Sequence, residues 1–268
     1  MHFGTGKIHT GSNTLILDQG VIADGASGTS YVDGKLQRNL AAGSQNGVNF
    51  YIGDAASYTP VIIDFNNISS TGNLIVGTMG NDHPNIATSI INPAKSVNRN
   101  WVFIASGMPF SNCDVTFNWT SGDVDAGANF NTFIIGKYNA PNWTYPTVGM
   151  ATPPYSLKAV GLTSFSDFQI GEPPCTVNIP DANFKNALLS NPSINTNSDG
   201  EIQCTEAAAF YGTINVASLG IQYLTGIEAF ANITGLVCYN NQLSTLNVSA
   251  NTALTTLDCG GNNLTSLD

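Results

Sequence analysis

The first 172 residues alternate between short apolar runs and dense turn signals. Runs such as TPVIIDFNNI and CDVTFNW are rich in Val, Ile and Phe, and Gly- or Pro-containing turns separate them. In the second run Val115, Phe117 and Trp119 are spaced by two, which places them on one face of a strand. Strands at this spacing, without a helical pattern, predict an antiparallel β-sandwich over residues 1–172.

The pattern changes at residues 173–175, where two consecutive prolines cannot continue a central strand and therefore predict a linker. The following segment, 176–213, places Phe184 and Leu188 at helical spacing. Asp181 precedes them at the position of a helix cap. We therefore expect a small helical cap over this segment.

Residues 214–268 contain a repeat. Apolar positions recur at offsets of 22 and then 21 residues, in the sets Ile214, Val216, Ile221, Leu224; Leu236, Cys238, Leu243, Leu246; and Leu257, Cys259, Leu264, Leu267. With Asn241 and Asn262, the last two sets fit L-x-x-L-x-L-x-x-N-x-L. Each repeat of this pattern supplies a short strand with apolar residues inward, and the Asn amide bonds backbone groups at the bend. The pattern predicts a short leucine-rich-repeat solenoid.

The repeat core LVCYNNQLSTLNVSANTALTTL resembles that of leucine-rich-repeat surface proteins of Bacteroidota, of the internalin-like kind, and the resemblance covers about residues 177–268. In the first region GSNTLIL, SYVDGKLQR and YTPVIIDF resemble β-sandwich modules of proteins exported by the type IX system. The resemblance implies a secreted or cell-surface protein. Because the sequence stops at Asp268, one residue past Leu267 and inside a repeat, we expect a fragment that is truncated at both ends, with incomplete repeats.

The loop NTNSDGEIQCTE follows the spacing of an EF-hand calcium loop. A Ca²⁺ ion would take side-chain oxygens and one backbone carbonyl from Asn195, Asn197, Asp199, Glu201 and Glu206. Asn195 stands where Asp is usual, which removes one charge and should weaken the affinity. The alternative is an Asx-rich turn that leads into a capped helix and needs no ion. Both interpretations remain open at this stage.

Composition and charge exclude some partners. Only 26 of the 268 residues are charged, 8 Lys plus Arg and 18 Asp plus Glu, which gives a net charge of −10. This balance argues against nucleic acid as a partner. No run of about 18 apolar residues is present, so we expect no membrane span. Low charge with abundant Asn, Gly and Thr favours an extracellular protein.

Five cysteines, an odd number, exclude complete pairing within the chain. Cys175 and Cys204 flank the first predicted helix and could form a disulfide. Cys238 and Cys259 fall at an inward repeat position, where we expect buried apolar residues rather than a redox or metal role. The N-terminal residues do not have the pattern of a signal peptide, so an extracellular protein would need a leader before residue 1.

No set of catalytic residues can be assembled from the sequence, and we expect a non-catalytic protein. The first hypothesis is protein–protein interaction or adhesion through the exposed face of the repeats. Its ligand-binding residues would be Val237, Tyr239, Asp258 and Gly260. The alternative is a carbohydrate-binding or accessory module of a larger secreted enzyme. Its aromatic platform would come from Trp119, Trp143, Tyr145 and Tyr155, with Trp119 and Trp143 as the leading candidates.

Overall fold

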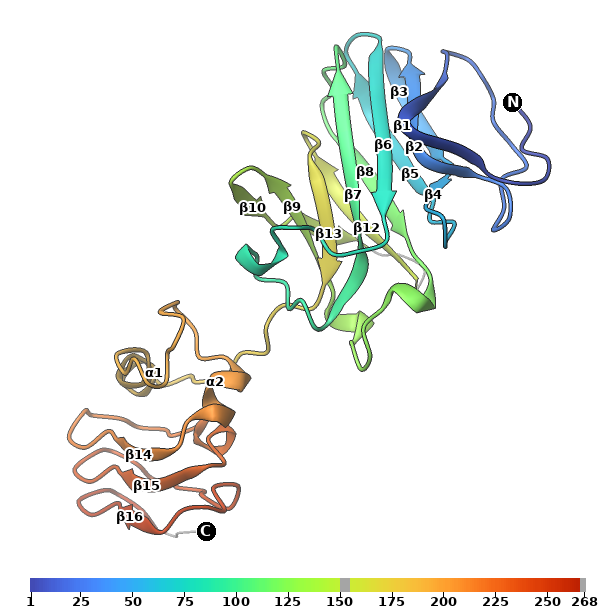
Figure 1. The fold of residues 1–268 in the computed structure, drawn as a ribbon. Coiled ribbons are helices and arrows are strands. Elements are labelled where there is room, and N and C mark those ends of the chain that lie inside the picture. Colours follow the sequence, from blue (N-terminus) through green and yellow to red (C-terminus); the bar gives the residue numbers. More distant parts are fainter. Residues whose placement is uncertain (150–154, 266–268) are drawn as a thin grey trace. The chain divides into compact units, whose positions relative to one another are not determined.

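The computed structural model describes residues 1–149 and 155–265 and is mainly β, as the sequence predicts. The chain forms two compact units, Met1–Pro173 and Pro174–Asp268, coloured blue to yellow and orange to red in Figure 1. Each unit has its own hydrophobic core. Within the described ranges, no helix is both long and apolar enough to cross a bilayer.

One sheet of the first unit has eight strands in the order β1-β2-β6-β7-β13-β9-β10, with β4 also paired to β2. The strands are β1 (Ile8–Leu17), β2 (Val32–Leu40), β4 (Ile52–Gly53), β6 (Gly72–Met79), β7 (Ser96–Ser106), β9 (Ile134–Asn139), β10 (Asn142–Thr144) and β13 (Asp167–Gly171). Most neighbours are antiparallel, but β2 pairs in parallel with β1 and with β4. The antiparallel expectation is therefore wrong at this edge. The connection from β1 to β2, residues 18–31, is long enough to return the chain to the end where β1 began.

The second sheet has five strands in the order β11-β12-β8-β5-β3, and all of its pairs are antiparallel. The strands are β3 (Gly43–Phe50), β5 (Val61–Ile68), β8 (Cys113–Asn118), β11 (Thr147–Gly149) and β12 (Ser156–Leu162). Three single-turn 3-10 helices lie in the connections: η1 (Ile86–Thr88), η2 (Ser121–Asp123) and η3 (Phe130–Thr132).

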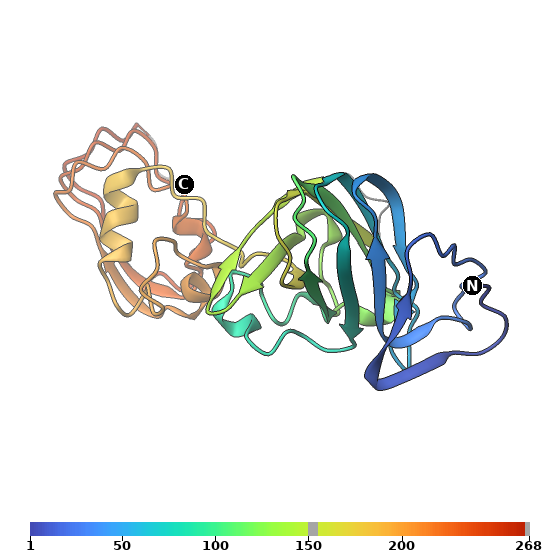
Figure 2. The same cartoon turned by 90° about the horizontal axis from the view of Figure 1, so that it is seen from above.

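The two sheets of the first unit share one core, and Figure 2 shows this unit from above. Phe117 on β8 packs against Trp101 on β7, with ring centroids 5.0 Å apart, and against Phe168 on β13 at 5.1 Å. Val115, Phe117 and Trp119 are all buried, so the predicted apolar face is confirmed. A fully buried side chain of this size contributes about 1.5–3 kcal/mol to folding. The arrangement is sandwich-like.

A buried ion cluster lies in this unit. The guanidinium of Arg99 is almost fully buried and donates to Asp54 Oδ2 at 2.9 Å and to Asp123 Oδ1 at 2.8 Å. Burial alone would raise the pKa of Asp54, but N–H groups of Ser57 and Ala56, together with Arg99, hold that pKa below its ordinary value. Removing one partner of such a cluster costs about 3–5 kcal/mol, because a charge is left buried and unpaired. Arg99 therefore joins β7 to the segments that carry its two carboxylates.

The second unit begins with two helices, α1 (Ala182–Leu189) and α2 (Cys204–Ala209). Asp181 caps α1 as predicted, since its Oδ1 accepts the N–H groups of Asn183 and Phe184, both at 3.0 Å. Its other oxygen accepts the N–H groups of Gln222 at 2.8 Å and Tyr223 at 3.2 Å. One carboxylate thus fixes α1 to the first bend of the repeat region. Burial would raise the pKa of Asp181, but these four N–H groups hold it below its ordinary value.

A disulfide joins Cys175 to Cys204, the pairing that the sequence left open. It closes the segment that contains α1, with a sequence separation of 29 residues. Residues around it also pair: the N–H of Cys204 donates to Cys175 O at 2.7 Å, and that of Val177 donates to Ile202 O at 2.8 Å. A loop of this length is stabilised by about 3–4 kcal/mol when a disulfide closes it.

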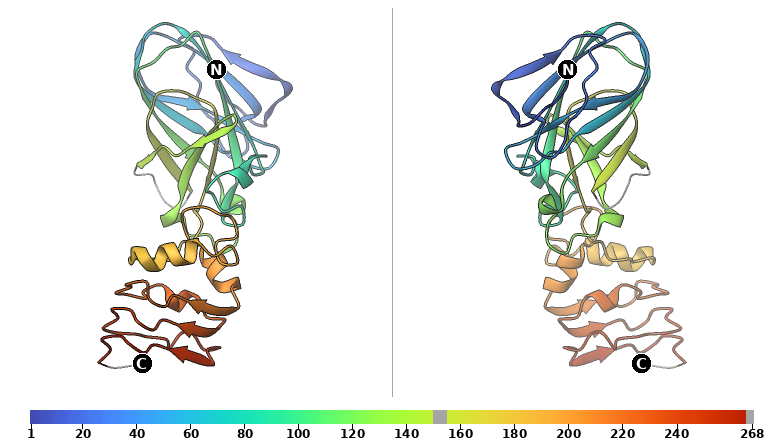
Figure 3. Two further views of the ribbon diagram at one scale, coloured as in Figure 1. Left: turned by 90° about the vertical axis from the view of Figure 1, so that its left-hand side faces the viewer. Right: turned by 90° about the vertical axis from the view of Figure 1, so that its right-hand side faces the viewer.

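Three short strands form a parallel sheet in the second unit: β14 (Gly212–Asn215), β15 (Ile233–Val237) and β16 (Thr256–Asp258). The register pairs Ile214 with Leu236 and Leu236 with Leu257. These are the residues that recur in the sequence at offsets of 22 and 21. Figure 3 shows the three strands one below another beneath α1, and the single-turn helix η4 (Ile227–Ala229) lies between β14 and β15 in the chain.

The amide of Asn241 satisfies backbone groups of two successive bends. Its Nδ2 donates to Val216 O at 2.8 Å and to Cys238 O at 3.0 Å, and its Oδ1 accepts the N–H groups of Leu219 and Ile221, both at 3.0 Å. Asn262 repeats the arrangement one step later. It donates to Cys238 O and Cys259 O and accepts the N–H of Leu243. Buried backbone groups without such partners would cost about 1–3 kcal/mol each.

Asn241→Ala should therefore lower the free energy of unfolding of the second unit by about 3 kcal/mol or more. All three tryptophans lie in the first unit, so tryptophan fluorescence monitors that unit and far-UV circular dichroism monitors both. In urea, the variant should lose its circular dichroism signal earlier while the tryptophan transition stays in place. Asn183→Ala, a change at an exposed position of α1, is the matched control. Equal midpoints for the two variants would contradict this role of Asn241.

Candidate functional site

The four residues that the sequence proposes for ligand binding lie together at the ends of β15 and β16 and just beyond them. Val237 on β15 pairs directly with Asp258 on β16. Two residues further on, Tyr239 is 38% exposed. The N–H of Asn240 donates to Gly260 O at 2.8 Å, which places Gly260 beside Tyr239 in the next turn of the chain. We call Val237, Tyr239, Asp258 and Gly260 the strand face.

Two features shape the strand face. The alternate residues Leu236 and Cys238 are fully buried, so they hold the backbone against the core while their neighbours turn outward. Gly235 on β15 is buried beside β14, since a Cβ there would come within 2.5 Å of Thr213 Oγ1. The strand face is therefore apolar at the end of β15 and aromatic two residues beyond it, with a carboxylate at the end of β16.

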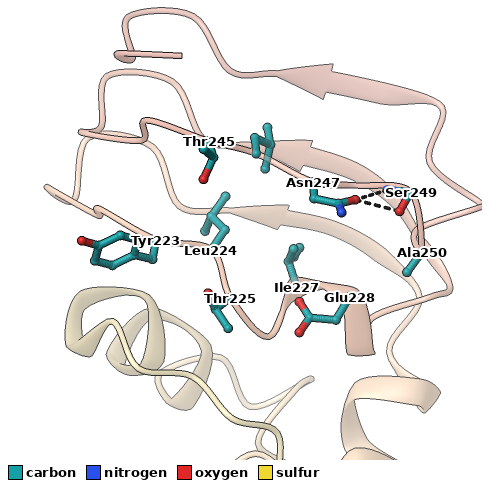
Figure 4. Close-up of a pocket in the computed structure, with 10 residues that line it drawn as sticks. Tyr223, Leu224, Thr225, Ile227, Glu228, Thr245, Asn247, Ser249 and Ala250 are labelled. Carbon is teal, nitrogen blue, oxygen red and sulfur yellow. Dashed lines mark hydrogen bonds between the residues drawn. The ribbon is translucent and has the colours of Figure 1, made fainter. Parts of the chain in front are cut away.

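A pocket of about 400 Å³ lies in the same unit, at the positions that follow the strands. Its floor is formed by the buried side chains of Leu224, Ile227 and Leu246. Its other lining residues are polar or small: Tyr223, Thr225, Glu228, Thr245, Asn247, Ser249 and Ala250 (Figure 4). Sequence reasoning identified the leucines as inward positions but missed the pocket, because the residues around them carry no motif.

Two polar groups of this pocket already have local partners. Asn247 Oδ1 accepts both the N–H and the hydroxyl of Ser249, at 2.9 and 2.7 Å, the two bonds drawn in Figure 4. Glu228 Oε2 accepts the N–H of Gly226 at 2.8 Å. These bonds fix the walls of the pocket without closing it.

The EF-hand-like loop brings most of its predicted ligands together. Glu206, near the start of α2, reaches back to the beginning of the loop, where its Oε1 accepts the N–H of Thr196 at 2.7 Å and that of Asn197 at 3.3 Å. Asp199 Oδ2 accepts from the side-chain amides of Asn197 at 2.9 Å and Gln203 at 2.8 Å. Glu201 is predicted to supply only its backbone carbonyl, and its carboxylate is free to pair with Lys185 at 2.7 Å.

Calcium can be tested against these contacts. The donor set is rich in oxygen, as Ca²⁺ requires, and Ile202 is buried at the inward position. Asn195 is 6% exposed, and its Oδ1 has no hydrogen-bond partner among the described residues, although its Nδ2 donates to Leu189 O and Asp199 O. The backbone departs from the pattern at the turn, because Ser198 takes a positive φ of 59° and Gly200 does not. In the described ranges, no three His, Cys, Asp or Glu side chains gather as a metal cluster.

The aromatic platform of the alternative hypothesis does not form as expected. Trp119 is only 4% exposed and packs near Phe130 and Phe133, since its position on the alternating run turns it into the core. The indole N–H of Trp143 donates to Thr88 Oγ1 at 3.1 Å. The hydroxyl of Tyr145 accepts the N–H of Ile90 at 2.8 Å. Tyr155 is exposed, but the buried Trp119 cannot share a surface with it.

Cys238 and Cys259 are placed as the repeat predicts. Cys238 is fully buried and Cys259 half-buried, both in the core of the second unit. Burial, followed by the neighbouring Cys259 and Asp258, raises the pKa of the Cys238 thiol to about 12. A thiol with this pKa stays protonated at neutral pH and behaves as a small apolar side chain.

Comparison with known proteins gives little. No family model matches the chain, and no curated protein matches it. Among solved structures, the CBM51-2 and INT domains of ZmpB from Clostridium perfringens are similar at 10% identity over 94% of this chain and 80% of that chain, with a TM-score of 0.25. A likeness at this TM-score carries no argument about fold or function.

Proposed function

We propose that residues 214–268 form a short leucine-rich-repeat solenoid, and that the strand face binds a protein ligand. The observation that carries the proposal is the parallel register, which pairs Val237 with Asp258 and stacks residues 21 or 22 positions apart. The Asn241 and Asn262 amides lie at the bends where the leucine-rich pattern requires them. The resemblance to internalin-like surface proteins supports the same assignment.

The chemistry of the strand face suits a protein partner. Tyrosine supplies a large contact area with few rotatable bonds and is frequent among the residues that dominate interface energies. Tyr239 and Val237 offer such an apolar centre, and Asp258 adds one carboxylate at its edge. A partner would therefore present an apolar surface with a cation or hydroxyl beside it.

We further propose that the protein is non-catalytic and acts outside the cell or at its surface, with residues 1–172 as a β-sandwich module. The Cys175–Cys204 disulfide supports this location, because disulfides persist in oxidising compartments. The low charge and the net charge of −10 agree with it.

We also propose that the loop from Asn195 to Glu206 binds Ca²⁺ weakly. The unpartnered Asn195 Oδ1 supports this, because a cation would give that buried oxygen a partner. Asp199 and Glu206 would supply the charge, and the amides of Asn197 and Gln203, which now donate toward Asp199, would have to rotate to present oxygen. The ion would stabilise the contact between the loop and α2.

Asn195→Asp should strengthen this site, because it restores the charge usual at the first position of the loop. With Ca²⁺ at about 10 mM, above the 10⁻⁴–10⁻³ M range of weak extracellular sites, the melting temperature of both proteins should rise, and more so for the variant. Mg²⁺ at the same concentration is the control, and the variant without Ca²⁺ should gain nothing. If Ca²⁺ leaves both melting temperatures unchanged, the loop is an Asx-rich turn without an ion.

Tyr239→Ala should weaken ligand binding by about 2 kcal/mol or more if Tyr239 is an anchor of the interface. Fluorescently labelled protein can be titrated onto intact cells before and after protease treatment of the cell surface. Binding should be saturable, protease-sensitive and at least about 30-fold weaker for Tyr239→Ala, while Tyr155→Ala, an exposed tyrosine of the first unit, should bind normally. Binding that survives protease, or equal binding by both variants, would contradict the proposal.

A further inference from the structure

A cavity of about 540 Å³ opens in the first unit, lined from both of its sheets. β2 of the eight-stranded sheet, β3 of the five-stranded sheet and the connection that follows β1 all contribute residues. Its volume lies within the range of about 300–1,000 Å³ usual for small-molecule sites. Neither the sequence motifs nor the proposed function involves it.

Arg38 on β2 is the only cationic residue among those that line this cavity. Leu36 and Leu40, each two residues away on the same strand, are both buried. Because residues spaced by two share one face of a strand, the side chain of Arg38 points to the same inner side of the sheet. Its Nη1 donates to Asn49 O at 2.8 Å and its Nη2 to Val21 O at 3.2 Å. Desolvation by burial lowers the pKa of Arg38, but a guanidinium stays charged at neutral pH.

The charge of Arg38 is not neutralised. Between residues 1–149 and 155–265, no carboxylate oxygen lies within 4.0 Å of its guanidinium nitrogens. The other arginine of the chain, Arg99, contacts both Asp54 and Asp123. A chain with 18 acidic residues thus leaves one partly buried guanidinium without a counter-ion, and two carbonyls occupy only two of its five N–H donors.

The remaining chemistry of the cavity identifies the class of ligand. A planar guanidinium matches a carboxylate with two parallel hydrogen bonds. A single cation in a protein of net charge −10 suits one negative charge better than a phosphate dianion or a polyanion. The side-chain amides of Gln19 and Gln45 also line the cavity, and amides bond readily to hydroxyl groups. Tyr51, packed edge-on against Phe3 with centroids 5.6 Å apart, adds an aromatic wall.

We propose that this cavity binds a hydroxylated carboxylate, of the uronic-acid type, with Arg38 holding the carboxylate and Gln19 and Gln45 holding hydroxyl groups. The site belongs to the first unit and is independent of the strand face. The competing interpretation is that Arg38 only joins the connection after β1 to β3 through the two carbonyls. That structural role would predict a stability change on mutation without any selective binding.

Titration of the ¹⁵N-labelled chain with D-glucuronate, D-glucose and inorganic phosphate, at matched ionic strength, separates these interpretations. Glucuronate should shift the backbone amides of residues 19–23 and 47–49 in a saturable manner, and glucose should not at the same concentration. Arg38→Gln should weaken glucuronate binding by about 10- to 100-fold, the effect of losing hydrogen bonds to a charged group. Lys35→Gln removes the same charge from an exposed position of the same strand and should bind glucuronate like the unmodified chain.

Gln45→Glu tests the site without removing Arg38. The new carboxylate would compete for the guanidinium and repel an anion, while the bonds of Arg38 to Asn49 O and Val21 O stay in place. Loss of glucuronate binding with an unchanged melting temperature is the expected result. Undiminished binding by Gln45→Glu, equal shifts with glucose, or tighter binding of phosphate than of glucuronate would each overturn the proposal.

Discussion

The second unit depends on how its buried bends satisfy their backbone. After each short strand the chain turns sharply while still inside the unit, so carbonyl and N–H groups at the turn lose their contact with water. One side chain, that of Asn241, supplies hydrogen bonds to two such turns. It donates to Val216 O and Cys238 O and accepts the N–H groups of Leu219 and Ile221. A hydroxyl or a carboxylate could not do both, because only an amide carries two donors and an acceptor on a short stem. These hydrogen bonds of Asn241 hold successive turns together, and so they also hold the residues of the strand face beside one another.

Scarcity of charge gives the few ionic groups distinct structural roles. In the second unit Asp181 joins α1 to the bend at Gln222 through four N–H groups. In the first unit Arg99 bonds two carboxylates, whereas the hydrogen bonds of Arg38 to described residues go to backbone carbonyls. Most of the other side-chain hydrogen bonds come from neutral amides and hydroxyls. Because charged residues are few, Arg38 has no counter-ion among the described residues. For the same reason the strand face carries a single charge, on Asp258.

Much of the local structure was predictable because each signal is local. The alternation through Val115 and Phe117 and the cap at Asp181 all depend on neighbours within a few residues, and the pairing of Leu236 with Leu257 depends on a repeat within the sequence. The parallel pairing of β1 with β2 was not predictable, since a long connection can return to either end of a strand. The pocket of Figure 4 and the cavity around Arg38 depend on residues that are distant in sequence and have no motif.

Hydrogen–deuterium exchange of the unmodified chain, followed amide by amide in native conditions, shows whether the Asn241 and Asn262 amides hold the buried bends. The N–H groups of Leu219, Ile221 and Leu243 lie outside the strands and are protected only if the Asn241 and Asn262 amides bond them. Their exchange should be as slow as that of Leu236 in β15, within about tenfold, because opening them requires the unit to open. Fast exchange at these three amides, with slow exchange confined to the strands, would show that the two Asn side chains do not hold the bends.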